Sequence, residues 1–92
     1  MKTIQIAISH GDGLHARPAS LFCGLAAKFN SDIQVRNFTT ETDFVPAKSI
    51  LSILTLGVES GHQIELTADG TDEDEAIAQI QALIENNFPE PN

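Results

Sequence analysis

Apolar residues recur at every second position in three short stretches of the chain, which is the period of a β-strand with one buried face, and a further short strand is expected over residues 44–46. In the first stretch, Ile4, Ile6 and Ile8 alternate with polar or small residues. In the last, Ile64 and Leu66 are expected to point inward. The predicted strands cover residues 3–8, 33–35, 44–46 and 63–68.

Three longer stretches place apolar residues three or four positions apart, which is typical of a helix with one buried face. Pro18 suits the first turn of the first helix, because the N–H that proline lacks would have no intrahelical partner there. The last helix is expected to open with a capping box, formed by Thr71 with Asp74 or by Asp72 with Glu75. The predicted helices run from residue 16 to about 30, from 47 to about 55, and from 71 to about 87.

The order strand, helix, strand, strand, helix, strand, helix predicts the fold class. It fits an α+β domain in which helices pack on one face of a small antiparallel sheet. Neither a repeat nor a linker interrupts the pattern, so one domain is expected over residues 1–88. Pro89 and Pro91 predict a short non-helical tail over residues 89–92.

Composition narrows the class of protein further. The 92 residues, 41% of them hydrophobic, suffice for one modest core. The single cysteine, Cys23, excludes an internal disulfide, and there is no Cys/His cluster at zinc-binding spacing. No apolar run approaches the roughly 20 residues of a membrane span. We therefore expect a cytoplasmic protein that is not inserted in a membrane and binds no metal.

The formal net charge of −8 argues against nucleic acid or an anionic membrane surface as a partner. Acidic residues concentrate in residues 41–43 and 69–75. This distribution leaves room for a locally positive face around Arg17, Lys28 and Lys48.

The strongest chemical signal is residues 13–19, in which His15 and Arg17 stand where a loop becomes a helix. The amides of Ala16 and Arg17 then belong to the first helical turn, where N–H groups lack intrahelical partners and the helix dipole favours an anion. The guanidinium of Arg17 adds a planar fork suited to phosphate oxygens. The segment therefore predicts a phosphate site with His15 as nucleophile, although a loop histidine beside a solvated arginine is the commoner meaning of such a pair.

The other reactive side chains are expected to have no catalytic role. His10 and His62 fall in predicted loops without a partner at ligand spacing, so both are interpreted as surface residues. Cys23 falls on the buried face of the first helix and is expected to be an inert core residue. Ser49, near a predicted helix start, is on its own most simply an N-cap.

Residues 13–19 resemble the active-site signature of the HPr family, the histidine phosphocarriers of the bacterial phosphoenolpyruvate-dependent sugar phosphotransferase system. Residues 47–51 with 55–57 resemble the second helix of that family, and residues 67–73 resemble the entry to its last helix. The resemblance covers essentially the whole chain. It implies an HPr-like open-faced β-sandwich, in which three helices cover one face of a four-stranded antiparallel sheet in the order βαββαβα.

The resemblance also implies roles for individual residues and partners. It makes His15 the phosphorylated residue, Arg17 the stabiliser of the phosphoryl group and Ser49 a regulatory phosphorylation site. The implied partners are enzyme I, sugar-specific IIA domains, an HPr kinase/phosphorylase and a transcriptional regulator. The protein would be a monomeric covalent carrier rather than an enzyme, and it would need no cofactor.

A docking surface is predicted beside His15. If Ile53 and Leu56 turn toward the core, the other large aliphatic side chains of the second helix are left at the surface, which a free-standing domain normally avoids. A rotated helix that buries some of them is the alternative. The predicted docking residues are Ser20, Leu21, Lys48, Ile50, Leu51 and Leu54.

Two other classes of function remain open at this stage. One is a regulatory binding module, in which phosphorylation of Ser49 creates a surface for a transcriptional regulator and His15 is secondary. The other is a structural or ligand-binding α+β domain with a fortuitous motif. Acid-labile label from phosphoenolpyruvate and enzyme I would separate the carrier from both.

Overall fold

The predicted order of elements is confirmed by the computed structural model, which describes residues 1–9, 11 and 13–89. His10, interpreted as a surface residue, and positions 90–92 of the predicted tail lie outside the described residues. The elements are β1 (Lys2–Ala7), α1 (Ala16–Ala26), β2 (Asp32–Asn37), β3 (Val45–Pro46), α2 (Ile50–Leu54), β4 (Gln63–Asp69) and α3 (Glu73–Glu85). Within the described ranges, no helix has the length and apolar character needed to cross a membrane.

The strands form one antiparallel four-stranded sheet in the order β1-β4-β2-β3. Leu66 of β4 stands opposite Ile4 on one side and Val35 on the other, so the apolar positions of the three long strands share one face. Side chains on successive strand residues alternate between the two faces, which is why the period of two in the sequence predicted the buried residues Ile64 and Leu66 correctly.

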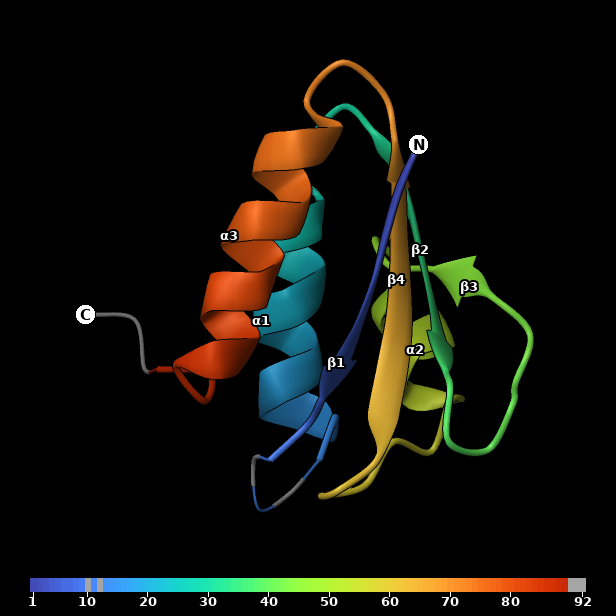
Figure 1. Cartoon of the computed structure of the whole chain (residues 1–92). Coiled ribbons are helices and arrows are strands. Elements are labelled where there is room, and N and C mark those ends of the chain that lie inside the picture. Colours follow the sequence, from blue (N-terminus) through green and yellow to red (C-terminus); the bar gives the residue numbers. More distant parts are fainter. Residues whose placement is uncertain (10, 12, 90–92) are drawn as a thin grey trace.

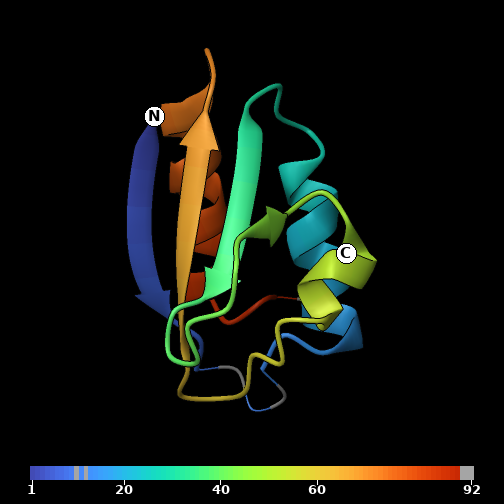
Figure 2. The ribbon, with the colours of Figure 1, turned by 90° about the vertical axis from the view of Figure 1, so that its right-hand side faces the viewer.

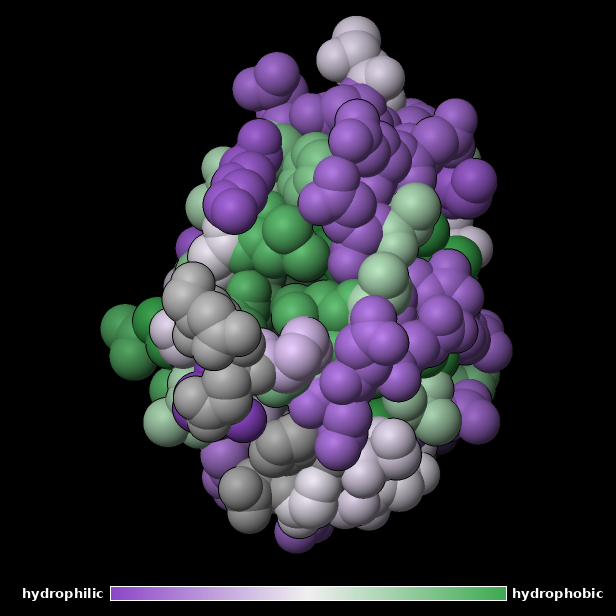
Figure 3. Space-filling view, turned by 90° about the vertical axis from the view of Figure 1, so that its left-hand side faces the viewer, coloured by the Kyte–Doolittle hydropathy of each residue, from purple (hydrophilic) through white to green (hydrophobic). Residues whose placement is uncertain are grey.

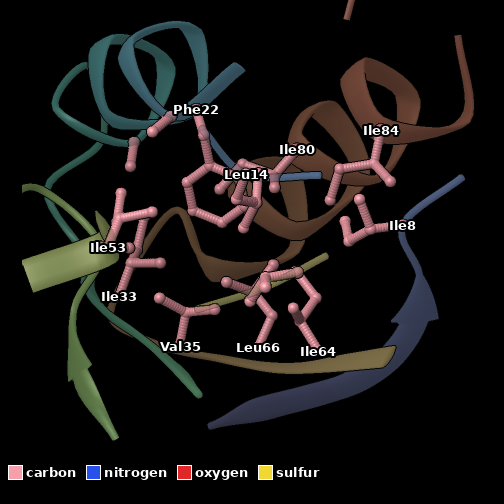
Figure 4. Packing of buried hydrophobic residues seen from close by; sticks show 14 of the residues in the cluster. Ile8, Leu14, Phe22, Ile33, Val35, Ile53, Ile64, Leu66, Ile80 and Ile84 are labelled. Carbon is pink, nitrogen blue, oxygen red and sulfur yellow. The ribbon is translucent and has the colours of Figure 1, made fainter. Parts of the chain in front are cut away.

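The helices lie on one side of this sheet. Figure 1 shows α1 and α3 packed side by side against one face, while Figure 2 shows α2 next to α1, beyond the edge formed by β3. The core fills the space between the layers, where Phe22 of α1 and Ile80 of α3 meet Leu66 of β4 (Figure 4). Each such side chain, fully buried, contributes about 1.5–3 kcal/mol to folding.

The other face of the sheet is open in the part of the chain that the structure describes (Figure 2). It can remain open because its side chains are polar and bind one another. Gln5 Nε2 donates to one oxygen of Glu65 at 3.0 Å, and Arg36 Nε donates to the other at 2.8 Å. The hydrogen bond from Gln5, followed by the hydrogen bond and charge of Arg36, lowers the pKa of the Glu65 carboxyl.

The first helix ends earlier than predicted, at Ala26 instead of about Asn30. Its last turn tightens because Lys28 N donates to Leu25 O and Phe29 N donates to Ala26 O, which are bonds between residues three apart. Phe29 is still buried, but it belongs to the turn that follows the helix. Cys23, expected to be a core residue, is only partly buried.

The second helix begins at Ile50 rather than at Ala47. Ala47 N instead donates to Ile33 O at 2.9 Å, which continues the pairing of β3 with β2 and keeps Ala47 out of the helix. Ser49 is the N-cap, and its Oγ accepts a hydrogen bond from Ser52 N at 3.3 Å. The N-cap interpretation of Ser49 is therefore confirmed.

Both capping boxes predicted for the third helix are wrong. Within the described residues, the Asp72 side chain makes no capping bond to α3; it accepts hydrogen bonds from Asn30 N, Ser31 N and Ser31 Oγ instead. The carboxylate thus ties the start of α3 to the turn before β2. The helix ends at Glu85, two residues before the predicted end, and Phe88 returns to the core beyond it.

Candidate functional site

His15 is the N-cap residue of α1, with an extended backbone at φ −84° and ψ −164°. Its carbonyl oxygen accepts a hydrogen bond from Ala19 N at 2.8 Å, which starts the helix. Among the described residues, its imidazole caps no amide of the helix. The backbone of His15 is therefore fixed by the helix start, while the ring stays exposed to solvent.

Four consecutive residues line an open hollow of about 380 Å³ around this helix end: His15, Ala16, Arg17 and Pro18. The first three are exposed, whereas Pro18 is buried and anchors the turn. The structure thus brings together His15 and Arg17, as the sequence predicted. Because the hollow opens to solvent, a group carried by another protein can reach the ring.

The electrostatics of this helix end favour an anion. The first turn of an α-helix carries amides without intrahelical partners and the positive end of the helix dipole. Ala16, Arg17 and Pro18 include no acidic residue that would occupy this end. The side chain of Arg17 adds a positive charge to the same hollow.

The loop that leads into His15 is held by the loop between α2 and β4. Leu14 N donates to Val58 O at 3.0 Å, and the Leu14 side chain is buried. Gly13 has a φ of +62°, and a Cβ at this position would stand 2.3 Å from Val58 O. Only glycine meets both demands, so the backbone just before His15 is set by close packing against residues 58 and 59. Figure 1 shows these loops at the same end of the molecule as the start of α1.

The second helix presents the aliphatic side chains that the sequence singled out. Ile53 and Leu56 are buried as expected, while Ile50, Leu51 and Leu54 are 36%, 74% and 41% exposed. The helix is not rotated to bury them, so the alternative of a core role for these three is wrong. Since α1 and α2 pack against each other, this apolar surface adjoins the first helix.

The remaining predicted docking residues differ in their surroundings. Ser20 is exposed and Leu21 is half-buried. Both line a groove of about 350 Å³ between α1 and α3 that also includes Leu83 (Figure 3). Lys48 is exposed, but its ammonium group donates to Phe29 O at 2.7 Å, so it also fastens the end of α1 to the start of α2.

Sequence reasoning missed two polar residues that bind each other in the loop region between α2 and β4 and at the end of β2. His62, interpreted as a surface residue, is half-buried and hydrogen-bonded. Asn37, which lies beyond the predicted strand of residues 33–35, is the last residue of β2 and fully buried. Their side chains meet at 3.1 Å. A histidine three residues after a glutamate in a loop carries no local signal for this contact, because its partner is 25 positions away in the chain.

Comparison with known proteins agrees with this geometry. Residues 2–86 match the family model of the PTS HPr component phosphorylation site. The "Phosphocarrier protein HPr" of Mycoplasma pneumoniae is 37% identical over 87 residues, which cover 95% of this chain and 97% of that protein.

Two solved structures from Thermoanaerobacter tengcongensis are similar to the chain. One, of HPr-C-His, has a TM-score of 0.91 and 46% identity over 100% of both chains. The other, of an HPr dimer, has a TM-score of 0.75 and 47% identity, covering 98% of this chain and 100% of that one. The sequence match, the open-faced sandwich and the histidine at the start of α1 agree, and the chain belongs to the HPr family, the phosphocarriers of the phosphotransferase system.

Proposed function

We propose that His15 accepts a phosphoryl group from phosphorylated enzyme I and passes it to sugar-specific IIA domains in phosphoenolpyruvate-dependent sugar uptake. The observation that carries this proposal is the exposed imidazole of His15, which shares a hollow with Arg17 at the start of α1. The first turn of this helix contains no acidic residue. A cytoplasmic, monomeric carrier remains our prediction.

The chemistry needs only groups that this hollow contains. A ring nitrogen of His15 gives its lone pair to phosphorus, while the bond from phosphorus to the donor group of enzyme I breaks and its electron pair leaves with the donor. Arg17 and the amides of the first turn of α1 stabilise the oxygens of the transferring group. Positioning and electrostatic stabilisation supply most of the rate in such transfers.

The protein then ends each cycle as it began, once an acceptor takes the phosphoryl group from His15. It is therefore a covalent carrier between enzymes, without turnover of its own. The mechanism uses no cofactor held by this chain, because the ring nitrogen is itself the nucleophile.

Docking is assigned to Ser20, Leu21, Lys48, Ile50, Leu51 and Leu54. The support is the exposed aliphatic side chains of α2 and the packing of α2 against α1. Aliphatic side chains at a contact lose their exposure to water when a partner covers them, which favours binding.

Regulation is assigned to Ser49. A kinase that phosphorylates Ser49 would add a charge of about −1.5 to −2 directly before Ile50 and Leu51. That charge would oppose docking of enzyme I and create a feature that a transcriptional regulator can bind. A purely regulatory module would have no need of the hollow that contains His15 and Arg17. We therefore assign phosphoryl transfer as the main role and phosphorylation of Ser49 as its regulation.

The test is incubation with phosphoenolpyruvate and enzyme I, followed by measurement of acid-labile phosphate on the protein. We expect stoichiometric label on the wild type and on His10→Ala, and none on His15→Ala with an unchanged circular dichroism spectrum. Arg17→Ala should be labelled about 100-fold more slowly, because it lacks one preorganised charge in the transition state. Full labelling of His15→Ala would overturn the proposal.

A further inference from the structure

The buried side chain of Asn37 has one unambiguous orientation. Its Nδ2 donates to Leu56 O at 3.2 Å, and its Oδ1 accepts from Thr40 N at 3.2 Å. A carbonyl oxygen can only accept and an amide N–H can only donate, so the amide of Asn37 cannot be flipped. It follows that Asn37 presents an N–H to His62 Nδ1, at 3.1 Å.

A second donor faces the same ring nitrogen. Glu59 N lies 3.2 Å from His62 Nδ1, and a backbone amide has only a proton to offer. Because both neighbours donate, Nδ1 must carry its lone pair and the ring proton must sit on Nε2. His62 is thus an acceptor that joins β2, through Asn37, to the loop between α2 and β4.

That loop holds the segment before His15 at both ends. His62 O accepts from Ile8 N at 2.8 Å, and Gly61 N donates to Ile8 O at 2.7 Å, directly after β1. Val58 O accepts from Leu14 N at 3.0 Å, one residue before His15. The Asn37 side chain also holds Leu56 O, where the loop leaves α2. The loop of residues 57–62, here called the supporting loop, is therefore hydrogen-bonded to Ile8 and to Leu14. Within this loop, His62 Nδ1 accepts the hydrogen bonds that hold it to Asn37 and to Glu59 N.

We propose that His62 is a positioning residue for phosphoryl transfer at His15. Its Nδ1 accepts hydrogen bonds from the Asn37 side chain and the Glu59 amide and so fixes the supporting loop of residues 57–62. Through Val58 O, this loop fixes Leu14 and the start of α1. The inference rests on the proposed role of His15. It goes beyond that role because it assigns a function to a residue that does not line the His15 hollow.

The experiment compares two substitutions of nearly equal shape. His62→Asn places a carbonyl oxygen where Nδ1 stands, so it keeps an acceptor for both donors, whereas His62→Leu has the same branching without an acceptor. Transfer from enzyme I to His15 is measured by quench-flow, well below the melting temperature of every variant. We expect His62→Leu to be about tenfold slower and His62→Asn to stay within about twofold of wild type.

Two further measurements separate positioning from a general loss of stability. Hydrogen exchange of the Leu14 amide should accelerate in His62→Leu and return toward wild type in His62→Asn. Ile80→Val, a core substitution in α3, should lower the melting temperature while leaving the transfer rate and Leu14 exchange unchanged. In wild type, ¹⁵N chemical shifts of the His62 ring should show an unprotonated Nδ1 and a protonated Nε2.

The outcomes distinguish the two proposals. If His15 of the wild type accepts no phosphate, the proposed function fails, whatever the ring of His62 does. If the wild type transfers normally and His62→Leu matches His62→Asn in rate and in Leu14 exchange, the positioning role is wrong. The same conclusion follows if Ile80→Val slows transfer as much as His62→Leu.

Discussion

The first and third helices begin in opposite electrostatic settings. The first turn of α3 holds Glu73, Asp74 and Glu75, while the first turn of α1 holds no acidic residue and contains Arg17. Both ends carry the positive pole of a helix dipole. The chain has a net charge of −8 and many acidic residues, yet the first turn of α1 contains none of them.

The acidic side chains at the start of α3 have partners within the protein. The Met1 amino group lies 3.2 Å from a Glu73 carboxylate oxygen, and Lys2 Nζ lies 3.2 Å from Asp74. Gly70 N donates to Glu73 at 3.1 Å, and this bond, followed by that from the Met1 amino group, lowers the pKa of Glu73. The carboxylates in the first turn of α3 are thus engaged in contacts within the protein, whereas residues 16–18 of α1 contribute no carboxylate to the positive pole of their helix.

The difference between the first turns of α1 and α3 is removed most directly by a substitution that places an acidic residue in the first turn of α1. Ala16→Glu places a carboxylate beside His15 and leaves Arg17 in place. We expect it to slow phosphorylation by enzyme I about tenfold at low salt and less at 0.5 M salt, because the added charge repels the phosphoryl group and is screened by ions. Ala16→Gln is the matched control and should stay within about twofold of wild type. Equal rates for the two variants would show that the charge of this turn is irrelevant.

At the start of α2, two substitutions of Ser49 separate the effect of an added charge from the effect of a lost N-cap. Ser49→Asp keeps an N-cap oxygen and adds a charge, whereas Ser49→Ala loses the cap without adding charge. We expect Ser49→Asp to bind enzyme I severalfold more weakly, and Ser49→Ala to bind normally but to lose about 1 kcal/mol of unfolding free energy. Titration calorimetry and urea denaturation measure the two effects separately. Equal enzyme I affinity of both variants would remove the support for regulation at Ser49.

The smallest expected effect concerns acid stability at the start of α3. The Ser31 hydroxyl, together with the Asn30 and Ser31 amides, lowers the pKa of Asp72. A lowered folded-state pKa means that the stabilisation is present above the unfolded value and is lost as pH falls below about 4. Asp72→Asn should therefore be less stable at pH 7 and show a flatter decline toward pH 3 in urea denaturation. Ser31→Ala should act in the same direction, and the two effects should not add. A decline as steep as that of wild type in Asp72→Asn would contradict this assignment.

Local patterns in the sequence predicted the parts of the molecule that depend on neighbouring residues. The alternation of Ile64 and Leu66 gave the inner face of β4, and Ser49 was placed as an N-cap from its position alone. His15 and Arg17 were found because they and the first turn of α1 lie within a few residues of one another.

Contacts between distant segments explain the errors. Asp72 binds Asn30 and Ser31, about forty positions earlier, so a capping template that compares neighbouring residues assigned it the wrong partner. The same limit hid Asn37 and His62, which meet only after β2 has been placed beside β4. The candidate site could thus be located from the sequence, while the loop packing that supports it could not.

The most direct test of the contrast between α1 and α3 is a pair of ¹H–¹⁵N correlation spectra of the wild type, recorded before and after phosphorylation by enzyme I and phosphoenolpyruvate. The new phosphoryl group on His15 should shift the amide signals of Ala16 and Arg17 strongly, because they line the hollow that receives it. The amides of Glu73, Asp74 and Glu75 should not move. Stoichiometric phosphorylation with unshifted Ala16 and Arg17 signals, or with equal shifts at the start of α3, would contradict the account.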